Sequence, residues 1–249
     1  MQSRVPPKRP RILLVEDDTI SQAYFRAVLE TLSTDVDAVT TCACARACAD
    51  ARRHDLWLID LTLPDGSGIE LLHGLRKRWP HPPPALAHTA DADPCLRAPA
   101  LQAGFLDVLV KPLATADLTD AVRGALALAT PDALAAPAPL ARPEAPAGSG
   151  GLPDWDHAAA AAALNHDPAN VQALRALFLA ELAEARQQIL DHVRDGDQVA
   201  LRSRLHRLQA SCGLIGARRL GAAVDQLRHA PGSHTALDDF IHAARDLLP

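Results

Sequence analysis

Five short apolar runs, each followed by a segment of helical period or composition, place the strongest constraint on the fold. The runs are Ile12–Val15, Val36–Thr40, Leu56–Ile59, Ala85–His88 and Val108–Val110. Strands that alternate with helices form a parallel sheet, because each crossover helix returns the chain to the same edge of the sheet. We therefore predict an α/β domain over residues 11–129, with a doubly wound five-stranded parallel sheet of order 2-1-3-4-5 and helices on both faces.

The sequence changes character after residue 129. Residues 130–153 are rich in proline, alanine and glycine and lack periodicity, which is typical of a semi-flexible linker. Residues 154–249 show only helical periods, in apolar stripes that run over 171–193, 201–215, 220–227 and 237–248. Short polar connections between these stripes predict an all-α four-helix bundle, preceded by a short helix that begins at Trp155. Residues 1–10 are predicted to form a basic N-terminal arm.

Composition and charge exclude several classes of function. Aromatic residues make up only 3% of the chain and the formal net charge is -5, so a nucleic-acid partner is not expected. The first apolar run has four residues, too few for a secretory core or a membrane span, and predicts a cytoplasmic protein without a membrane partner. No glycine-rich phosphate loop or kinase signature occurs, so neither domain is expected to bind ATP.

The five cysteines are odd in number and unevenly spread, which does not indicate a disulfide framework. Cys42, Cys44 and Cys48 form a C-x-C-x3-C cluster in which a metal site is conceivable. Only Cys44 and Cys48 share a helical face, however, and no histidine is close in sequence. The alternative is that these cysteines are small packed side chains.

Acidic residues follow two of the predicted strands directly. Glu16 and Asp17 come after the first strand, and Asp60 comes after the third. In the predicted sheet these strands are neighbours, and the crevice at their carboxyl ends is where such folds bind ligands. A cluster of carboxylates repels itself unless a cation neutralises it, and oxygen ligands suit magnesium. We expect a Mg²⁺ cofactor there.

Thr89 ends the fourth strand and Lys111 follows the fifth, so a hydroxyl and an ammonium reach the same edge of the sheet. An ammonium and a metal ion beside one carboxylate stabilise the charge of a phosphoryl group in transfer. Lys111 is one of only three lysines in a chain that prefers arginine, which favours a specific need for an ammonium there. The alternative is an ordinary surface lysine.

The segments ILLVEDD, LWLIDLTLPDGSG, HTA and LVKP, in this order and spacing, resemble the receiver domain of bacterial response regulators. The resemblance covers about half of the chain and implies a flavodoxin-like fold with Asp60 as the phosphoacceptor. It also implies that Glu16 and Asp17 form the acidic pocket. Magnesium would be held by Asp17, Asp60 and the backbone carbonyl of Thr62.

By the same resemblance, Thr89 and Lys111 contact the phosphoryl oxygens. Receiver domains usually carry tyrosine or phenylalanine three residues before the lysine, and the movement of that ring with the threonine relays phosphorylation to the output face. Val108 stands at this switch position, beside Thr89. The helix before the fifth strand also contains Pro94 and Pro99, which tend to kink it. These departures predict an atypical output mechanism.

His206 is the candidate site of the helical domain. Arg202, His206, Gln209 and Gly213 share one helical face, with the small residue Ala210 beside it. Five arginines and no acid occur between Gln198 and Val224, a distribution complementary to an acidic receiver pocket.

The segment RLHRLQASCGLIGARRL resembles the active helix of histidine phosphotransfer (HPt) domains, in which His206 is the phosphorylated residue and Gly216 matches a family glycine. Gln209 replaces the usual lysine and Ala210 the usual glycine. The docking face for a receiver is then Arg202, Gln209, Ala210 and Gly213. The substitutions predict weaker stabilisation of the phosphoryl group without loss of the nucleophile.

Together these features predict a two-component phosphorelay protein that accepts and carries phosphoryl groups and is not itself a kinase. Its expected partners are a sensor histidine kinase and other receiver or HPt proteins, with Asp60 and His206 exchanging phosphoryl groups within one molecule or between molecules. Three alternatives stay open. They are a binding antagonist of a kinase or regulator, a phosphate sink, and a four-helix interaction module whose histidine has no chemical role. The oligomeric state is not predicted.

Overall fold

The computed structural model describes residues 9–91, 94–129, 154–163 and 168–248, which fold as two compact units. One unit contains an α/β domain and the other a helical domain. The predicted linker at 130–153, and residues 1–8 of the predicted basic arm, lie outside the described residues.

The α/β domain contains a five-stranded sheet in the order β2-β1-β3-β6-β7. Its strands are β1 (Arg11–Val15), β2 (Asp35–Val39), β3 (Leu56–Asp60), β6 (Ala85–Thr89) and β7 (Val108–Val110). The predicted order 2-1-3-4-5 is confirmed, since β6 and β7 are the fourth and fifth strands of this sheet. Strands β1, β2, β3 and β6 pair in parallel, and each strand boundary falls within one residue of the prediction.

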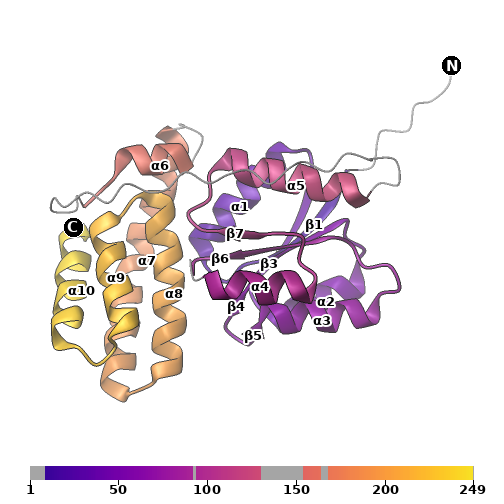
Figure 1. Cartoon of the computed structure of the whole chain (residues 1–249). Helices are drawn as coiled ribbons and strands as arrows, with labels where there is room; N and C mark the ends of the chain where they lie inside the picture. The colour runs from indigo at the N-terminus through magenta and orange to yellow at the C-terminus, as the bar shows by residue number, and fades with distance from the viewer. Residues whose placement is uncertain (1–8, 92–93, 130–153, 164–167, 249) are drawn as a thin grey trace. The chain divides into compact units, whose positions relative to one another are not determined.

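Five helices cover the two faces of the sheet, with α1 and α5 on one face and α2, α3 and α4 on the other (Figure 1). They are α1 (Thr19–Thr31), α2 (Cys42–Ala51), α3 (Gly68–Arg78), α4 (Pro94–Ala103) and α5 (Thr115–Ala129). Apolar side chains alternate between the two faces of the strands. Leu13, Trp57 and Ile59 pack toward α2 and α3 in a core with little solvent exposure. This core is typical of a doubly wound α/β fold.

A small hairpin after β3 was not predicted from the sequence. It consists of β4 (Thr62–Leu63) and β5 (Gly66–Ser67), which pair antiparallel around a turn. Within that turn the Asp65 carboxylate accepts hydrogen bonds from the backbone N–H groups of Cys42 (2.7 Å) and Ala43 (2.9 Å). Because these groups lie in the first turn of α2, Asp65 caps that helix and fixes the hairpin beside the carboxyl edge of the sheet.

The helical domain is the expected four-helix bundle with a short preceding helix. Its elements are α6 (His157–Ala163), α7 (Pro168–Asp195), α8 (Gln198–Ile215), α9 (Arg218–His229) and α10 (His234–Leu247). Helix α8 contacts α6, α7 and α9, and is therefore the central helix of the bundle. The Asp197 carboxylate caps its first turn by accepting a hydrogen bond from the N–H of Ala200 (3.0 Å).

The predicted apolar stripe of the last helix is shifted by one residue. Residues 237, 241, 244 and 248 were expected to face the core, but only Ala244 is buried and the other three are partly buried. The remaining buried side chains of the helix are Ala236, Phe240, Ala243 and Leu247. Phe240 is fully buried, and placing this large ring in the core rotates the helix relative to the stripe of aliphatic residues.

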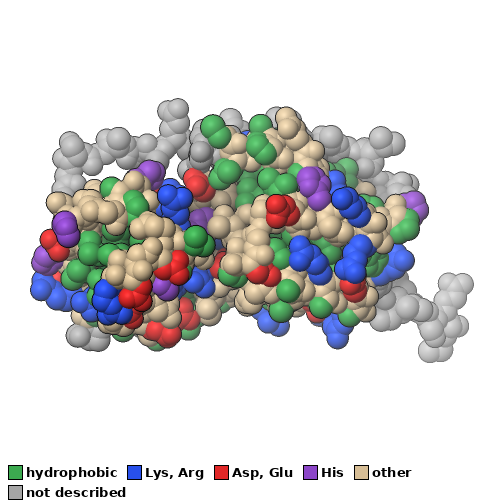
Figure 2. Space-filling view, turned by 90° about the horizontal axis from the view of Figure 1, so that it is seen from below, with side chains coloured by type: hydrophobic (Ala, Val, Ile, Leu, Met, Phe, Trp, Pro, Cys, Tyr) green, Lys and Arg blue, Asp and Glu red, His purple; other side chains and the backbone are tan. Residues whose placement is uncertain are grey.

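Among the described residues, no helix is both long and apolar enough to cross a membrane. On the face seen in Figure 2, acidic and basic side chains are interspersed with hydrophobic and polar ones. Several opposite charges form surface ion pairs, such as Arg78 with Asp50 (2.9 Å) between α3 and α2. Exposed pairs of this kind contribute little to stability.

Candidate functional site

The first candidate site lies at the carboxyl ends of β1 and β3. Asp60 is the last residue of β3 and Glu16 follows β1 directly. The two strands are hydrogen-bonded neighbours, with Val15 in register with Ile59. Oxygens of the Glu16 and Asp60 carboxylates lie within 4.8 Å of each other, so the structure brings these two predicted site residues together.

A third side chain of this cluster, His88, was missed by the sequence reasoning. Its Nδ1 lies 3.4 Å from Oδ2 of Asp60 and 3.5 Å from Oε2 of Glu16. His88 is the register partner of Asp60 in the parallel β3–β6 pair, so the two side chains emerge on the same side of the sheet. The signal was present in the sequence, because a polar residue directly before Thr89 interrupts an apolar strand.

Backbone hydrogen bonds fix the two carboxylates. Oδ1 of Asp60 accepts a hydrogen bond from the N–H of Thr62 (2.8 Å), and Oε1 of Glu16 accepts one from the N–H of Asp18 (3.1 Å). Asp18 itself is the N-cap of α1 and accepts a hydrogen bond from the N–H of Ser21 (2.8 Å). It therefore serves the helix, whereas the half-buried Asp17 beside it remains a candidate for the pocket.

Thr89 and Lys111 occupy the ends of the next two strands. Thr89 is the final residue of β6 and Lys111 follows β7 directly, joined to Pro112 by a cis peptide bond. Both side chains are buried. The strand order places these residues at the same edge of the sheet as Asp60, where the sequence predicts a phosphoryl site.

Val108 begins β7 and is part of the hydrophobic core, with 3% of its surface exposed. The Arg97 guanidinium of α4 donates a hydrogen bond to the carbonyl of Val108 (3.1 Å) and also pairs with the Asp107 carboxylate (2.6 Å). Helix α4 is tied to the start of β7 in this way despite Pro99 in its interior. The switch position thus holds a packed aliphatic side chain and no ring.

The donor set at this edge fits a hard divalent cation. The carboxylates of Glu16 and Asp60 supply oxygen atoms, which are the ligands that Mg²⁺ prefers. Two buried carboxylates held close together are costly without a compensating positive charge. The arrangement can therefore hold a cation beside Asp60.

The second candidate site lies on α8, with His206 near the middle of the helix. Arg202 is exposed, Gln209 and Gly213 are half-buried, and Ala210 is buried. Arg202 precedes the histidine by four residues. Gln209 follows it by three and Gly213 by seven, so all three residues share its helical face. The structure thus presents the predicted docking residues on one side of α8.

Arg218 and Arg219 of the acid-free stretch form ion pairs inside the helical domain. Arg219 pairs with Asp154 (3.1 Å) and Asp246 (2.9 Å), and Arg218 lies 3.7 Å from Asp156. These contacts hold the segment before α6 against α9.

Gly216, which the family resemblance singled out, ends α8 in a left-handed conformation (φ 74°) that favours glycine. Its carbonyl accepts a hydrogen bond from the N–H of Asp156 (2.7 Å). A Cβ atom on Gly216 would overlap the carbonyl oxygen of Asp156. The glycine is thus required both for the helix end and for the close approach of the segment before α6.

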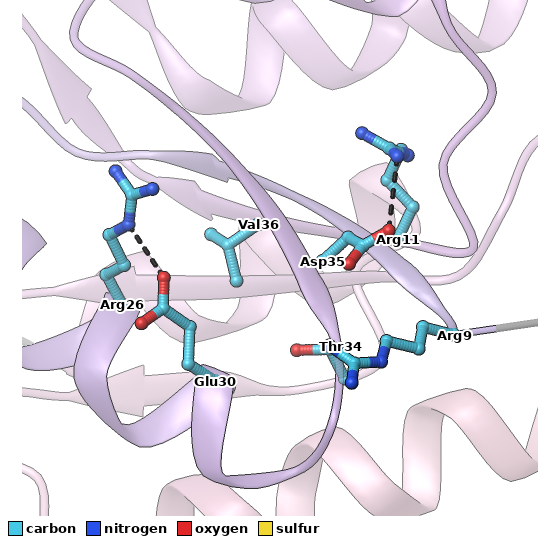
Figure 3. Close-up of a pocket in the computed structure, with 7 residues that line it drawn as sticks. All are labelled: Arg9, Arg11, Arg26, Glu30, Thr34, Asp35 and Val36. Atoms are coloured by element: carbon cyan, nitrogen blue, oxygen red, sulfur yellow. Dashed lines mark hydrogen bonds and ion pairs between the residues drawn. The ribbon is translucent and has the colours of Figure 1, made fainter.

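A separate shallow pocket of about 420 Å³ lies at the opposite, amino edge of the sheet (Figure 3). It is lined by Arg9, Arg11, Arg26, Glu30, Thr34, Asp35 and Val36. Arg11 pairs with Asp35 (3.2 Å) and Arg26 with Glu30 (2.9 Å), as the dashed lines show. Because these charges are neutralised internally, we assign no function to this pocket.

Comparison with known families matches a family to each of the two domains. Residues 12–123 match the response regulator receiver domain, and residues 173–248 match the Hpt domain. The first match contains every candidate residue of the acidic site. The second contains His206 and the residues around it.

The chain is similar to the aerobic respiration control sensor protein ArcB of Escherichia coli K12, with 37% identity over 114 residues, 45% of this chain and 14% of ArcB. It is also similar to the response regulator protein PilR of Pseudomonas aeruginosa, with 33% identity over 129 residues, 52% of this chain and 29% of PilR. The chain therefore spans less than a third of the length of either relative.

Among solved structures, the signal receiver domain of a Luxo repressor protein from Vibrio parahaemolyticus covers 49% of this chain and 93% of its own, with 30% identity and a TM-score of 0.47.

The protein thus joins a receiver domain to a C-terminal helical-bundle Hpt domain. Receiver and Hpt domains are phosphoryl acceptor and carrier modules.

Proposed function

We propose that Asp60 accepts a phosphoryl group from a histidine kinase or a phosphohistidine, and that His206 carries or exchanges such a group. The observation that carries this proposal is the position of Asp60, at the carboxyl end of β3 beside Glu16 and with one oxygen fixed by the N–H of Thr62. In the transfer step the phosphorus–nitrogen bond of the donor breaks as a phosphorus–oxygen bond to Asp60 forms.

The oxygen atoms at this edge would hold Mg²⁺ through Asp17, Asp60 and the carbonyl of Thr62. When bound, the cation neutralises negative charge on the phosphoryl oxygens. Thr89 and Lys111 would contact the same oxygens as a hydroxyl donor and an ammonium. Glu16 would complete the acidic pocket.

In the helical domain, the imidazole of His206 would be the nucleophile. Arg202, Gln209, Ala210 and Gly213 would form the face on which a receiver docks. Small side chains at 210 and 213 allow close approach of another backbone, and the positive charge of Arg202 complements an acidic pocket. Gln209 can donate a hydrogen bond to a phosphoryl oxygen but lacks the charge of a lysine.

The proposed partners are a sensor histidine kinase and other receiver or HPt proteins, with no nucleic acid or membrane among them. In this proposal the chain is an acceptor and carrier and has no kinase activity of its own. The domain boundaries at 11–129, 130–153 and 154–249 belong to the same proposal.

A second candidate function is a binding antagonist or phosphate sink, and one observation favours it. Val108 is packed in the core, so no aromatic ring can swing with Thr89 to change the output face. Phosphorylation of Asp60 would then leave that face unchanged, and the chain would act by removing phosphoryl groups from a kinase or by occupying it.

Transfer of radioactive phosphate from an active kinase tests the proposal. The parent chain should acquire label, part of it base-labile as aspartyl phosphate and part acid-labile as phosphohistidine. Asp60→Asn should lose both parts, because His206 receives its group from an aspartyl phosphate, and His206→Gln should lose only the second. The exposed-histidine control His229→Gln should behave like the parent. Absence of label from the parent, with a kinase that labels another receiver, would refute the relay. Label on the parent without onward transfer would favour the sink.

A further inference from the structure

We propose that His88 is a ligand, together with Glu16 and Asp60, of a first-row transition-metal dication in the receiver pocket, and that the pocket therefore prefers such ions to Mg²⁺. The inference rests on the proposed function, which places a cation beside Asp60. It goes further by naming a nitrogen ligand and the class of metal.

The spacing of the three side chains fits ligands of a single ion. Nδ1 of His88 is 3.4 Å from Oδ2 of Asp60 and 3.5 Å from Oε2 of Glu16, and all three atoms lie within 4.8 Å of one another. Hydrogen bonds between nitrogen and oxygen are usually shorter, about 2.7–3.2 Å. Ligand atoms bound at about 2.0–2.2 Å to one metal ion are separated by distances of the observed kind.

The imidazole is held rigidly in this position. His88 is fully buried in β6 and is paired in register with Asp60. Its ring packs against that of Phe25 from α1, with centroids 4.7 Å apart. A ring fixed by the sheet on one side and an aromatic side chain on the other keeps its nitrogen directed at the carboxylates. Such fixed first ligands favour metal binding because little order is lost when the ion enters.

The donor set determines the choice of ion. Carboxylate and carbonyl oxygens suit Mg²⁺, whereas an imidazole nitrogen suits transition-metal ions, which tolerate mixed nitrogen and oxygen ligands. A pocket lined by oxygen atoms alone would distinguish Mg²⁺ from transition-metal ions only by the size and charge of the ion. With His88 added, the pocket gains a ligand that Mg²⁺ uses poorly.

A second group of potential ligands in the domain provides a control. Asp37, Cys48 and His54 also place ligand atoms within 4.8 Å of one another. However, Arg11 (3.1 Å) and Arg52 (3.3 Å) both pair with the Asp37 carboxylate, so an entering cation would meet two guanidinium groups. We expect no metal ion there, and His54 is a buried histidine of the same domain without the proposed role.

Binding of Mn²⁺ to the full chain tests the inference. Mn²⁺ is paramagnetic and has little affinity for thiols, so the five free cysteines do not compete for it. Pulsed electron paramagnetic resonance should detect coupling of bound Mn²⁺ to an imidazole ¹⁴N nucleus. Competition with Mg²⁺ should show a preference for Mn²⁺ that falls by about tenfold or more in His88→Leu, because loss of even an outer-shell partner of a metal ligand costs about 10- to 100-fold in affinity. The control His54→Leu should keep both the coupling and the preference.

Absence of ¹⁴N coupling in the parent, or an unchanged Mn²⁺ preference in folded His88→Leu, would overturn the inference. If His88→Leu does not fold, the spectrum of the parent alone decides the matter. The labelling assay tests the proposed function independently, because phosphorylation of Asp60 in the presence of Mg²⁺ does not require His88 to bind a metal ion. Label on Asp60 without ¹⁴N coupling refutes the His88 ligand only, whereas coupling without label refutes the relay only.

Discussion

The backbone of Gly68 lies directly against that of Asp60. A Cβ atom on Gly68 would overlap the Asp60 carbonyl oxygen, and the Gly68 N–H donates a hydrogen bond to the carbonyl of Leu61 (3.0 Å). Gly68→Ala must therefore displace either the start of α3 or the end of β3. We expect it to destabilise the receiver domain by about 1–3 kcal/mol, the usual cost of overpacking, and to slow phosphorylation of Asp60.

The matched control for this variant is Gly74→Ala, six residues further along α3. A Cβ atom there meets only the Nε of Arg46 at 3.9 Å, and alanine favours a helix over glycine. Hydrogen exchange of the amides of β1 and β3 in the two variants measures the effect. Equal protection in Gly68→Ala and Gly74→Ala would show that the close approach of Gly68 to Asp60 does not affect stability.

The thiol of Cys42 should resist alkylation. Burial, together with the nearby negative charge of Asp65, raises the pKa of Cys42 to about 11. At neutral pH almost none of this thiol is ionised, and thiolate is the reactive form. Treatment with iodoacetamide followed by mass spectrometry should modify the exposed Cys44 of the same helix well before Cys42. Equal rates at the two positions would contradict the packing of α2 against the core.

His54 should make the receiver domain less stable in mild acid. Its pKa lies below the ordinary value of 6.5 because burial outweighs the opposing effect of the Asp37 carboxylate, which is 3.1 Å away. Arg11 lowers the pKa further and Asp55 raises it. Below pH 6.5 the unfolded chain binds a proton that the folded chain does not, so the free energy of unfolding falls until the pH reaches the folded pKa.

Urea denaturation at a series of pH values checks this prediction. The parent should lose stability as the pH falls below 6.5, and His54→Gln should lose less over the same window. Above pH 6.5 the histidine is neutral in both states, so the difference between the two proteins should be constant there. Parallel curves over the whole pH range would show that His54 does not titrate differently on folding.

Arg175 should hold the short helix α6 on the bundle. Its Nε donates a hydrogen bond to the carbonyl of Ile215 (3.0 Å), its Nη1 lies 3.0 Å from Nδ1 of His157, and its guanidinium stacks on the Trp155 ring at 4.5 Å. We expect Arg175→Ala to release α6, at a cost of about 1–3 kcal/mol, because a hydrogen-bonded charged group is lost. Lysine should not rescue it, since the planar group is needed.

Hydrogen exchange of the amides of α6 measures this release, and the exposed Arg194 of α7 is the control. Arg194 forms only surface ion pairs, with Asp191 (2.9 Å) and Asp195 (3.2 Å), so Arg194→Ala should change protection little. Unchanged protection of α6 in Arg175→Ala would mean that apolar packing alone holds this helix.

Much of the fold could be predicted because its local signals agree. The alternation of strands and helices set the sheet order, and the end of α7 at Asp195 follows from the Asp-Gly-Asp break in its apolar stripe. The β4–β5 hairpin could not be predicted in this way, since its four paired residues carry no periodicity. Asp65 in its turn accepts hydrogen bonds from the first turn of α2, a contact between positions 22 and 23 residues apart.

Only the part of the candidate site that follows from the order of the strands could be predicted from the sequence. Glu16 and Asp60 follow strands directly, so strand order alone brings them together. The sequence marks His88 only as a polar residue within an apolar strand, and its position beside Asp60 comes from the register of β3 with β6. Asp18, the third acid of the segment ILLVEDD, is the N-cap of α1. Register and capping are tertiary and backbone properties that composition does not specify.

Chemical trapping of the phosphorylated residue tests the central claim most directly. Borohydride reduces an aspartyl phosphate to homoserine, which mass spectrometry locates in the sequence. After incubation of the full chain with an active kinase, ATP and a divalent cation, homoserine should appear at position 60 in the parent and should be absent from Asp60→Asn. Homoserine at the position of another aspartate would contradict the assignment of Asp60 as the phosphoacceptor. So would the absence of homoserine from a protein that has acquired base-labile phosphate.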